Sequence, residues 1–381
     1  FVEVERLRRP ELRGRPVVVG GAGPRGVVAS ASYEARERGV RSAMPVARAT
    51  RMAPGLTVVP PDHAEYRRVS ALVFDILDGF TPSVERLSID EAFLDVSGLR
   101  RHYDGAVEVA AAIRLAIRTE LRLPASAGVA PNKLLAKLAS EEAKPDGIRY
   151  VPAGGVQAFL HALPVGKLWG VGAATLAQLE KLGVATIGDL AAVPERTLER
   201  RLGATLGRHL HLLARGIDDR PVSSAGEAKS VSVEVTFDVD IVTTAGIEAE
   251  LLRQSEQVAE RLRRSGLSGR TITVKLRFSD FTTVTRSRSL ESPTNVGRDV
   301  YRTARWLLQR SEVGERPVRL IGVGVSALES GTAPHQLATD RPPAWDDLAD
   351  AVSSVRGRFG DGAVRPARLL EADLGRETLA G

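Results

Sequence analysis

The order of periodic segments in the last third of the chain limits its fold more than any other feature. Between Lys229 and Ser330, apolar residues alternate in some segments, which predicts strands, and recur at helical spacing in others. The resulting order of strand, helix, strand, strand, helix, strand is typical of a split βαβ unit. The strands are predicted at residues 231–237, 271–278, 282–290 and 319–327, and the helices at 244–265 and 296–309.

The first part of the chain alternates short strands and helices, which predicts a mixed α/β domain that ends near Val151. Residues 152–218 hold only short helices separated by Gly and Pro, which indicates a small all-helical unit. The polar segment 219–228 is the predicted linker. In the first domain, strands are predicted at residues 16–20, 26–30, 56–59, 84–89, 92–96 and 125–129, and helices at 31–38, 45–52, 63–77, 106–121 and 132–143.

The tail at residues 331–381 predicts one amphipathic helix, because apolar residues repeat there at steps of three and four. Such a helix either docks on the same molecule or binds a partner, and the sequence alone leaves both open. The repeating residues are Trp345, Leu348, Val352, Val355 and Phe359.

With 381 residues, of which 43% are hydrophobic and 26% charged, the chain can form several globular domains. We find neither an apolar run of roughly 18 residues nor a signal peptide, which predicts no membrane span and a cytoplasmic location. The absence of cysteine excludes disulfides and Cys-ligated zinc, so oxygen donors and hard cations are the expected metal chemistry. The net charge of +6 favours polyanionic partners, although 53 basic against 47 acidic residues is a mild excess.

Two adjacent acids, Asp90 and Glu91, lie in the segment Ser88–Asp95, where two strand-like runs meet. Neighbouring side chains of a strand point to opposite faces, so both carboxylates reach one divalent cation only if the backbone bends there. Such a bend would make a Mg²⁺ site. A hairpin with an exposed Asp-Glu turn is the alternative, and these residues alone do not decide between the two.

Candidates for anion binding occur at two further places. Ser30, Tyr33 and Arg36 lie where a predicted strand enters a helix, which suits a triphosphate; a capping serine with a surface tyrosine and arginine is the alternative. Three lysines lie along, or just beyond, the predicted helix 132–143, where they either contact nucleic acid or form a solvated basic face. They are Lys133, Lys137 and Lys144.

Two segments predict contacts with a nucleic-acid backbone. In Leu168–Gly172, which has the shape of a helix-hairpin-helix turn, Gly170 and Gly172 let the backbone approach a phosphate; a plain Gly-rich loop is the alternative. Further on, alternate residues of the predicted strand 271–278 form a hydroxyl-rich, basic face, for which a plain solvent face is the alternative. Five basic residues against the single acid Asp280 leave +4 between residues 270 and 288. The five are Arg270, Lys275, Arg277, Arg286 and Arg288.

Together, these segments resemble the Y-family DNA polymerases, most closely the bacterial DNA polymerase IV type, over about residues 1–330. The resemblance implies an α+β multidomain fold with the right-hand architecture of a polymerase. Its parts would be fingers at residues 1–62, a palm of mixed sheet and helices at 63–151, a helix-hairpin-helix thumb at 152–218 and, after the linker, a βαββαβ little finger at 229–330. The motifs that carry the resemblance are Pro10–Gly14, Tyr33–Arg36, Ser88–Ala92, Asn132–Pro145 and Trp169–Gly172.

The resemblance also implies roles for single residues. Asp90 and Glu91 would hold two Mg²⁺ ions, with Glu91 on the ion that activates the primer 3′-hydroxyl. Phe1 aligns with the steric gate of the family, an aromatic ring that clashes with a ribose 2′-hydroxyl and so selects deoxynucleotides. The implied triphosphate clamp consists of Ser30, Tyr33, Arg36 and Lys144.

One part of the family pattern is absent from this sequence. In the family, a first palm strand with a further metal-binding aspartate lies a few residues before the steric gate, and this chain begins at Phe1. We therefore expect a sequence truncated at its N-terminus, which binds the catalytic metals poorly and incorporates nucleotides weakly or not at all.

The sequence thus predicts a monomeric, template-directed, low-fidelity DNA polymerase that copies past lesions on primer-template DNA from deoxynucleoside triphosphates. One alternative is a non-catalytic Y-family-like accessory protein in mutagenesis. Another is a general duplex-binding helix-hairpin-helix protein, which leaves Asp90 and Glu91 unexplained. The family often ends in a sliding-clamp peptide, and because His335–Thr339 is only a weak match to it, contact with the clamp stays open.

Overall fold

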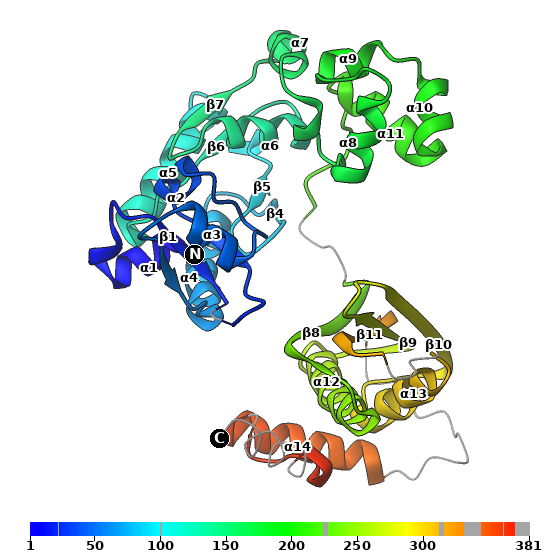
Figure 1. The fold of residues 1–381 in the computed structure, drawn as a ribbon. Coiled ribbons are helices and arrows are strands. Elements are labelled where there is room, and N and C mark those ends of the chain that lie inside the picture. The colour runs from blue at the N-terminus through cyan, green and yellow to red at the C-terminus, as the bar shows by residue number, and fades with distance from the viewer. Residues whose placement is uncertain are drawn as a thin grey trace. The chain divides into compact units, whose positions relative to one another are not determined.

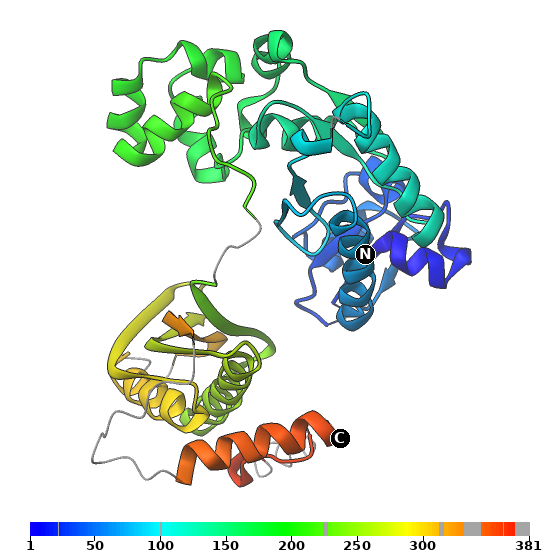
Figure 2. The ribbon, with the colours of Figure 1, turned by 180° about the vertical axis from the view of Figure 1, so that it is seen from behind.

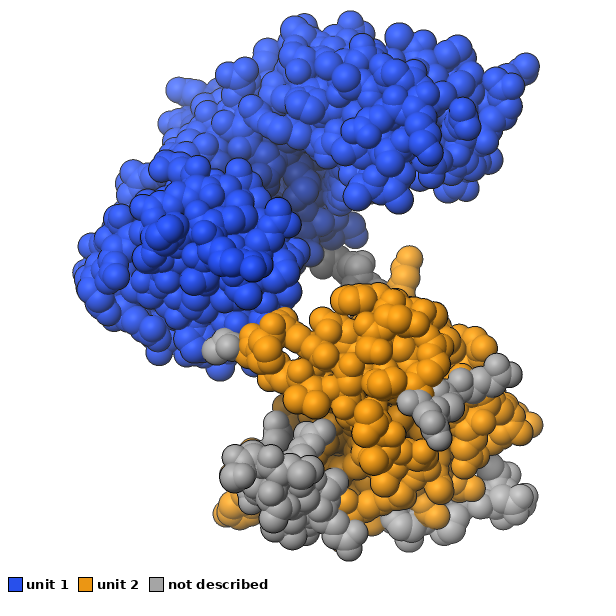
Figure 3. Space-filling model, in the orientation of Figure 1, with its two compact units in different colours: residues 1–22, 26–226 blue, residues 23–25, 227–381 orange. Residues whose placement is uncertain are grey.

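The chain forms two compact units, residues 1–22 with 26–226 and residues 23–25 with 227–381 (Figure 3). The division after Gly226 falls inside the predicted linker. Over the described residues, no helix has both the length and the apolar character that a membrane span needs. The computed structural model describes residues 1–21, 23–99, 101–223, 228–311, 316–330, 344–360 and 362–369.

The first sheet of unit 1 has β1 (Val17–Gly20) at its centre, antiparallel to β2 (Val28–Ala31) and parallel to β3 (Thr57–Val59). Every residue of β1 is buried, because alternate side chains of the strand enter cores on opposite faces of the sheet. The helices that supply these cores are α1 (Val2–Arg8) and α4 (His63–Asp78) on one side, and α2 (Tyr33–Glu37) and α3 (Val46–Met52) on the other.

The rest of the α/β part, for which the resemblance implies a mixed sheet with helices, holds one antiparallel and one parallel pair of strands, which form two separate sheets. In the antiparallel pair, β4 (Val84–Arg86) is shorter than predicted because residues 87–91 form the turn, and β5 (Ala92–Leu94) begins as predicted but ends at Leu94 rather than at residue 96. In the parallel pair, β6 (Ala127–Val129) lies beside β7 (Ile148–Tyr150). The sequence predicts β6 but not β7. Three residues are too few to show an alternating pattern.

Helix α6 (Lys133–Glu142) packs unusually close to β6. A Cβ atom on Gly128 of β6 would lie 1.9 Å from the carbonyl oxygen of Ala136, so only glycine allows this approach. On its other side α6 contributes Leu134, Leu135 and Leu138 to the core of the helical part. The helix is therefore fixed between two parts of unit 1. The neighbouring helix α5 (Ala106–Leu121) contacts both β6 and β7.

The helical part of unit 1 is a bundle of short helices around a core of leucine and isoleucine side chains (Figure 1). Its helices end early because Gly or Pro interrupts the sequence between them, as predicted. The helices are α7 (Val156–His161), α8 (Ala173–Glu180), α9 (Ile187–Ala192), α10 (Glu195–Leu202) and α11 (Ala204–Ala214).

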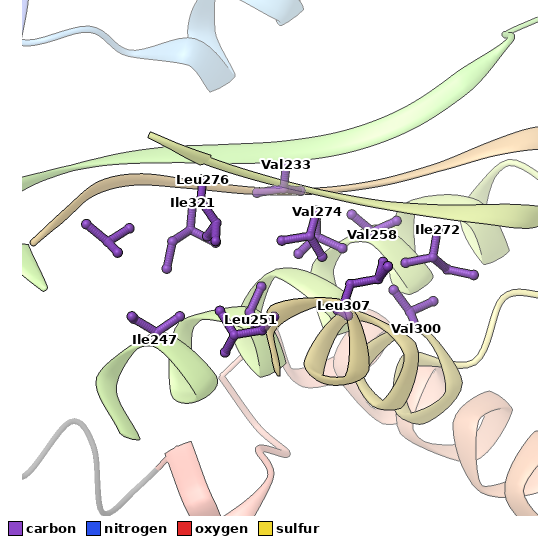
Figure 4. Close-up of a cluster of buried hydrophobic side chains, with 14 of the residues drawn as sticks. Val233, Ile247, Leu251, Val258, Ile272, Val274, Leu276, Val300, Leu307 and Ile321 are labelled. Atoms are coloured by element: carbon purple, nitrogen blue, oxygen red, sulfur yellow. The ribbon is translucent and has the colours of Figure 1, made fainter. Parts of the chain in front are cut away.

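Unit 2 has the predicted order of strand, helix, strand, strand, helix, strand. Its antiparallel sheet has the strand order β10-β9-β11-β8, and both helices lie on one face of it (Figure 1 and Figure 2). Figure 4 shows the core between them, in which Ile272, Val274 and Leu276 point toward the helices. The elements are β8 (Ser230–Ile241), α12 (Thr244–Arg264), β9 (Leu267–Phe278), β10 (Thr283–Thr294), α13 (Gly297–Gln309) and β11 (Val318–Ser330).

Helix α14 (Ala344–Phe359) lies where the sequence predicts an amphipathic helix, and it docks within unit 2. It contacts α12 through polar groups: the Ser353 hydroxyl donates to Glu260 at 2.7 Å and accepts from Arg263 at 2.7 Å. Leu348 and Phe359, which belong to the predicted apolar stripe, are exposed. The docked face is therefore a polar face of the helix, beside the apolar stripe.

Candidate active site and nucleic-acid-binding surfaces

The backbone bends at the two acids. Residues 88–90 form bends between β4 and β5, and the carbonyl oxygen of Glu91 accepts hydrogen bonds from the N–H of Leu87 at 2.9 Å and of Ser88 at 3.3 Å. The Ser88 hydroxyl donates to Asp90 Oδ1 at 2.7 Å, and Asp90 is exposed. The turn therefore carries two acids that are adjacent in sequence, exposed Asp90 in the bend and partly exposed Glu91 directly after it, on a backbone that hydrogen bonds hold in shape.

Helix α6 faces this hairpin with two lysines one turn apart. Lys137 Nζ donates to Glu91 Oε1 at 2.9 Å, and Lys133 Nζ donates to Glu85 of β4 at 2.7 Å. Lys133 is only 8% exposed and lies 5.5 Å from the centre of the Phe93 ring. The solvated basic face that the sequence offers as an alternative is therefore not formed at these two positions.

Phe1 packs beside the acidic turn, in one hydrophobic cluster with Ile89. Its ring stacks on Tyr66 of α4, with ring centres 4.4 Å apart and planes 10° apart. The Tyr66 hydroxyl donates to buried Glu5 at 2.7 Å, and burial together with this carboxylate raises the pKa of Tyr66 to about 12. Sequence reasoning does not find Tyr66, because only the fold brings it under Phe1.

The residues of the predicted triphosphate clamp lie on three elements. Ser30 is on β2, Tyr33 begins α2 with 43% of its surface exposed, and the Arg36 Nε donates to the carbonyl oxygen of Ala31 at 3.0 Å. Lys144 follows α6 and donates to Glu141 at 2.7 Å. The serine that caps α2 is Ser32, whose hydroxyl accepts from the Ala35 N–H, so Ser30 has no capping role there.

The predicted helix-hairpin-helix turn is exposed and precedes α8. Gly170 has a φ of +95°, a conformation that favours glycine, and Gly172 is the residue before the first turn of the helix. A Cβ atom on Gly172 would meet nothing within 4 Å, so its backbone is open to a large ligand. This geometry suits contact with a phosphate through backbone N–H groups.

A groove of about 1010 Å³ lies between β5, the start of α6 and the segment after α11. Asp95, Lys133, Asp218 and Arg220 are among its lining residues, whereas Asp90 and Glu91 are not. Burial acts to raise the pKa of Asp218, but hydrogen bonds and charge from Arg220 outweigh it and hold that pKa below its usual value. The groove therefore adjoins the acidic turn through β5 without containing it.

The open face of the unit 2 sheet is rich in hydroxyl groups. Thr271 and Thr273 of β9 hydrogen-bond across to serines of β10, at 2.9 Å in both cases. Lys275 pairs with Glu234 at 2.9 Å, and the Arg277 guanidinium donates to Thr283 at 2.9 Å. The predicted polar, partly basic face therefore exists on β9, although Glu234 offsets part of its charge.

Arg286 and Arg288 do not belong to this open face, which corrects the sequence-based prediction. They pair with Val274 and Ile272, and directly paired residues of antiparallel strands point to the same side. Both arginines therefore lie on the helix-covered side, where the Arg288 guanidinium sits 4.3 Å from the centre of the Trp306 ring. The net charge of +4 that the sequence predicts between residues 270 and 288 therefore combines residues that lie on opposite faces of the sheet.

Comparison with known proteins identifies the family of the chain. The impB/mucB/samB family matches residues 1–141, its C-terminal domain matches residues 228–339, and a domain described as the DNA polymerase-iota thumb matches residues 166–218. The DNA polymerase IV of Desulfatibacillum aliphaticivorans is 44% identical over 100% of this chain and 96% of its own length. That of Streptomyces coelicolor is 46% identical over 87% of this chain and 70% of its own length.

Solved structures give the same assignment. The "Y-family DNA polymerase chimera Dbh-Dpo4(243-245)-Dbh" has a TM-score of 0.79 at 28% identity and covers 87% of this chain and 97% of its own. DinB from Sulfolobus solfataricus has a TM-score of 0.59 at 28% identity over 86% of this chain and 95% of its own. The chain therefore belongs to the Y family of DNA polymerases. The curated relatives that it resembles over most of its length are DNA polymerase IV, and the predicted family and right-hand polymerase fold class are confirmed.

Proposed function

We propose that this chain is a template-directed DNA polymerase that copies past lesions with low fidelity. Relatives named DNA polymerase IV and the solved "insertion ternary complex of Dbh DNA polymerase" support this function and do not favour the accessory alternative. The geometric observation that carries it is the acidic turn: Asp90 lies in an exposed bend, Glu91 directly follows it, and Phe1 belongs to the same hydrophobic cluster as Ile89 of that bend.

The two carboxylates are suited to hold divalent cations. Their oxygens are the ligands that Mg²⁺ prefers, and Glu91 already has a cationic partner at 2.9 Å in Lys137. Among the described residues, no group of three or more acidic, His or Cys side chains is placed to hold a metal ion, so Asp90 and Glu91 form a partial ligand set. Polymerases of this family depend on divalent metal ions. Two bound Mg²⁺ ions would lower the pKa of the primer 3′-hydroxyl and neutralise the leaving pyrophosphate.

The residues around the turn would orient the incoming nucleotide. Phe1, held flat on Tyr66, would meet the sugar and exclude a ribose 2′-hydroxyl. Ser30, Tyr33 and Arg36 would contact the phosphates. Lys144 would also contact the phosphates. Breaking its ion pair with Glu141 would cost little free energy, because both side chains are more than 40% exposed.

The remaining assignments follow the family resemblance. The residues of unit 1 would form the fingers (1–62), palm (63–151) and thumb (152–218), and residues 229–330 of unit 2 would form the little finger. Gly170, Gly172, Lys275 and Arg277 would contact the DNA backbone, with Lys137 as a further candidate. Lys133 is buried against Glu85, and Arg286 and Arg288 lie on the helix-covered side of the unit 2 sheet, so these three are not proposed as DNA contacts. We propose that the enzyme acts as a monomer. The possible clamp peptide at residues 335–339 lies outside the described residues.

Primer extension tests the proposed function. A chain extended upstream of Phe1 with a family segment that carries the expected aspartate should incorporate deoxynucleotides, and Glu91→Ala should reduce incorporation at least about 100-fold, as loss of a metal ligand does. Glu120→Ala changes an exposed acid of α5 and serves as the matched control. Phe1→Ala should increase the use of ribonucleotides. Equal incorporation by the parent and Glu91→Ala proteins would refute the role of Glu91.

A further inference from the structure

One lysine of α6 connects the acidic turn to the helix-hairpin-helix turn. Lys137 Nζ donates to Glu91 Oε1 at 2.9 Å and lies 6.0 Å from the centre of the Trp169 ring. Trp169 directly precedes Gly170 of the hairpin. The side chains of Lys137 and Glu91 are 27% and 40% exposed, so this ion pair is partly shielded from water. A single side chain therefore contacts both the acid and the hairpin.

The Trp169 ring is itself held in place by its neighbours. The Phe93 ring lies 6.1 Å away, and the Arg220 guanidinium lies 4.4 Å from the indole centre. Arg220 pairs with Asp218 at 2.6 Å and 2.8 Å, and Asp218 in turn accepts the N–H of Leu134 at 3.0 Å. Since Leu134 is in the first turn of α6, the contacts form a closed circuit from α6 through the indole and back to α6.

We propose that Lys137 is a positioning residue for Glu91 and that Trp169 couples it to the hairpin. This inference rests on the proposed function, in which Glu91 holds a metal ion and the hairpin holds the DNA backbone. The Lys137 ammonium orients the carboxylate before a metal ion binds. Once the carboxylate is bound to metal, the ammonium loses its partner and shifts toward the indole face, which attracts cations. Whether Glu91 is bound to a metal ion thereby changes the surroundings of Trp169, the residue that precedes Gly170.

The first test observes Trp169 without any turnover. The chain has three tryptophans, so Trp306→Phe with Trp345→Phe leaves Trp169 as the only indole. Mg²⁺ is titrated into the chain extended upstream of Phe1 that carries these two substitutions, bound to a dideoxy-terminated primer-template and the matching nucleotide. We expect a saturable loss of Trp169 emission as the ammonium approaches the ring, because a nearby cation quenches an indole.

Variants in the same background decide whether Lys137 causes the signal. Lys137→Met and Glu91→Gln should abolish the loss of emission, whereas Lys181→Met, at the exposed end of α8, should retain it. A parent protein whose emission does not respond to Mg²⁺, or a Lys137→Met protein that responds as the parent does, would overturn the proposal.

The second test separates positioning from folding by steady-state kinetics of the extended chain. Lys137→Met should lower kcat about tenfold and leave the nucleotide KM within about twofold, since the interaction acts on the reacting geometry and not on nucleotide binding. Lys137→Arg, which keeps a cation against both groups, should restore most of kcat.

The outcomes also distinguish this inference from the proposed function. A purely structural Lys137 would lower the melting temperature of the Met variant and leave the kcat of its folded fraction unchanged, and that result would overturn the positioning role. If Glu91→Ala abolishes incorporation while Lys137→Met is fully active, only the inference fails. If Glu91→Ala is itself fully active, the proposed function fails.

Discussion

Replacing Asp218 by alanine should destabilise unit 1 by about 1–4 kcal/mol. The side chain is 2% exposed, and it accepts the N–H of Leu134 at 3.0 Å in the first turn of α6. Alanine leaves this buried N–H without its acceptor, which costs about 1–3 kcal/mol. Loss of the Arg220 ion pair adds at most about 1 kcal/mol, because the Arg220 side chain is 40% exposed and water screens the pair.

Urea and thermal unfolding of the protein with Trp169 as its only tryptophan measure this loss, since Trp169 belongs to unit 1. For a unit of this size, the melting temperature should fall by roughly 2–16 °C. Asp219→Ala changes the neighbouring, exposed acid and should alter the free energy of unfolding by less than about 0.5 kcal/mol. Equal losses of unfolding free energy in Asp218→Ala and Asp219→Ala would refute the argument that Asp218 stabilises unit 1 through its burial and its hydrogen bond with the Leu134 N–H.

The stabilisation by Asp218 should also depend on pH. Burial opposes ionisation, but Arg220 outweighs it and lowers the pKa of the folded carboxyl. The contribution is therefore fully present above the unfolded pKa of about 4 and is lost as the pH falls through the lower folded value. Asp218→Asn cannot ionise, so its unfolding free energy should decline less between pH 5 and pH 3 than that of the parent. Identical declines would contradict the assignment.

Two further predictions concern packing and DNA binding. Gly128→Ala should destabilise unit 1 by about 1–3 kcal/mol in urea unfolding, because its Cβ would lie 1.9 Å from the carbonyl oxygen of Ala136. Arg277→Ala, on the open face of the unit 2 sheet, should weaken duplex binding and reduce the salt dependence of the affinity by about one ion. Arg288→Ala should instead cost about 0.5–1 kcal/mol of unit 2 stability, because it loses the contact with Trp306 at 4.3 Å, and change the salt dependence less than Arg277→Ala does.

The elements of unit 2 could be predicted from the sequence because its strands and helices are long. From Thr271 to Phe278 of β9, alternation separates apolar from polar positions, and Ile272, Val274 and Leu276 are fully buried as that pattern requires. The three-residue strand β7 carries no such signal, which explains why it is missed. The division of β4 to β7 into two pairs depends on which strands lie side by side, and periodicity within one strand does not show that.

The faces of the elements were harder to predict than the elements themselves. Periodicity within β10 shows that Arg286 and Arg288 share a side, but only the pairing with β9 shows which side it is. In α14, the apolar repeat marks one face, whereas Ser353 and Arg356 make the contacts with α12. Which face of α14 packs against unit 2 therefore depends on charged groups of α12, and the sequence of α14 alone does not show them.

The candidate site combines acids that are adjacent in the sequence with a cationic partner that only the fold brings to them. The adjacent acids are local, so the sequence shows them directly, but Ser88–Glu91 alone leaves open whether they belong to a bent metal site or to an exposed hairpin turn. The partner of Glu91 is not local: Lys137 lies 46 residues further along, and its spacing from Lys133 equally describes an ordinary surface helix. Only the packing of α6 against β6, made possible by Gly128, brings both lysines onto the β4–β5 hairpin. The counter-ion of the acid is thus set by tertiary structure, and a variant that displaces α6 should disturb the acidic turn even where no residue of the turn is changed.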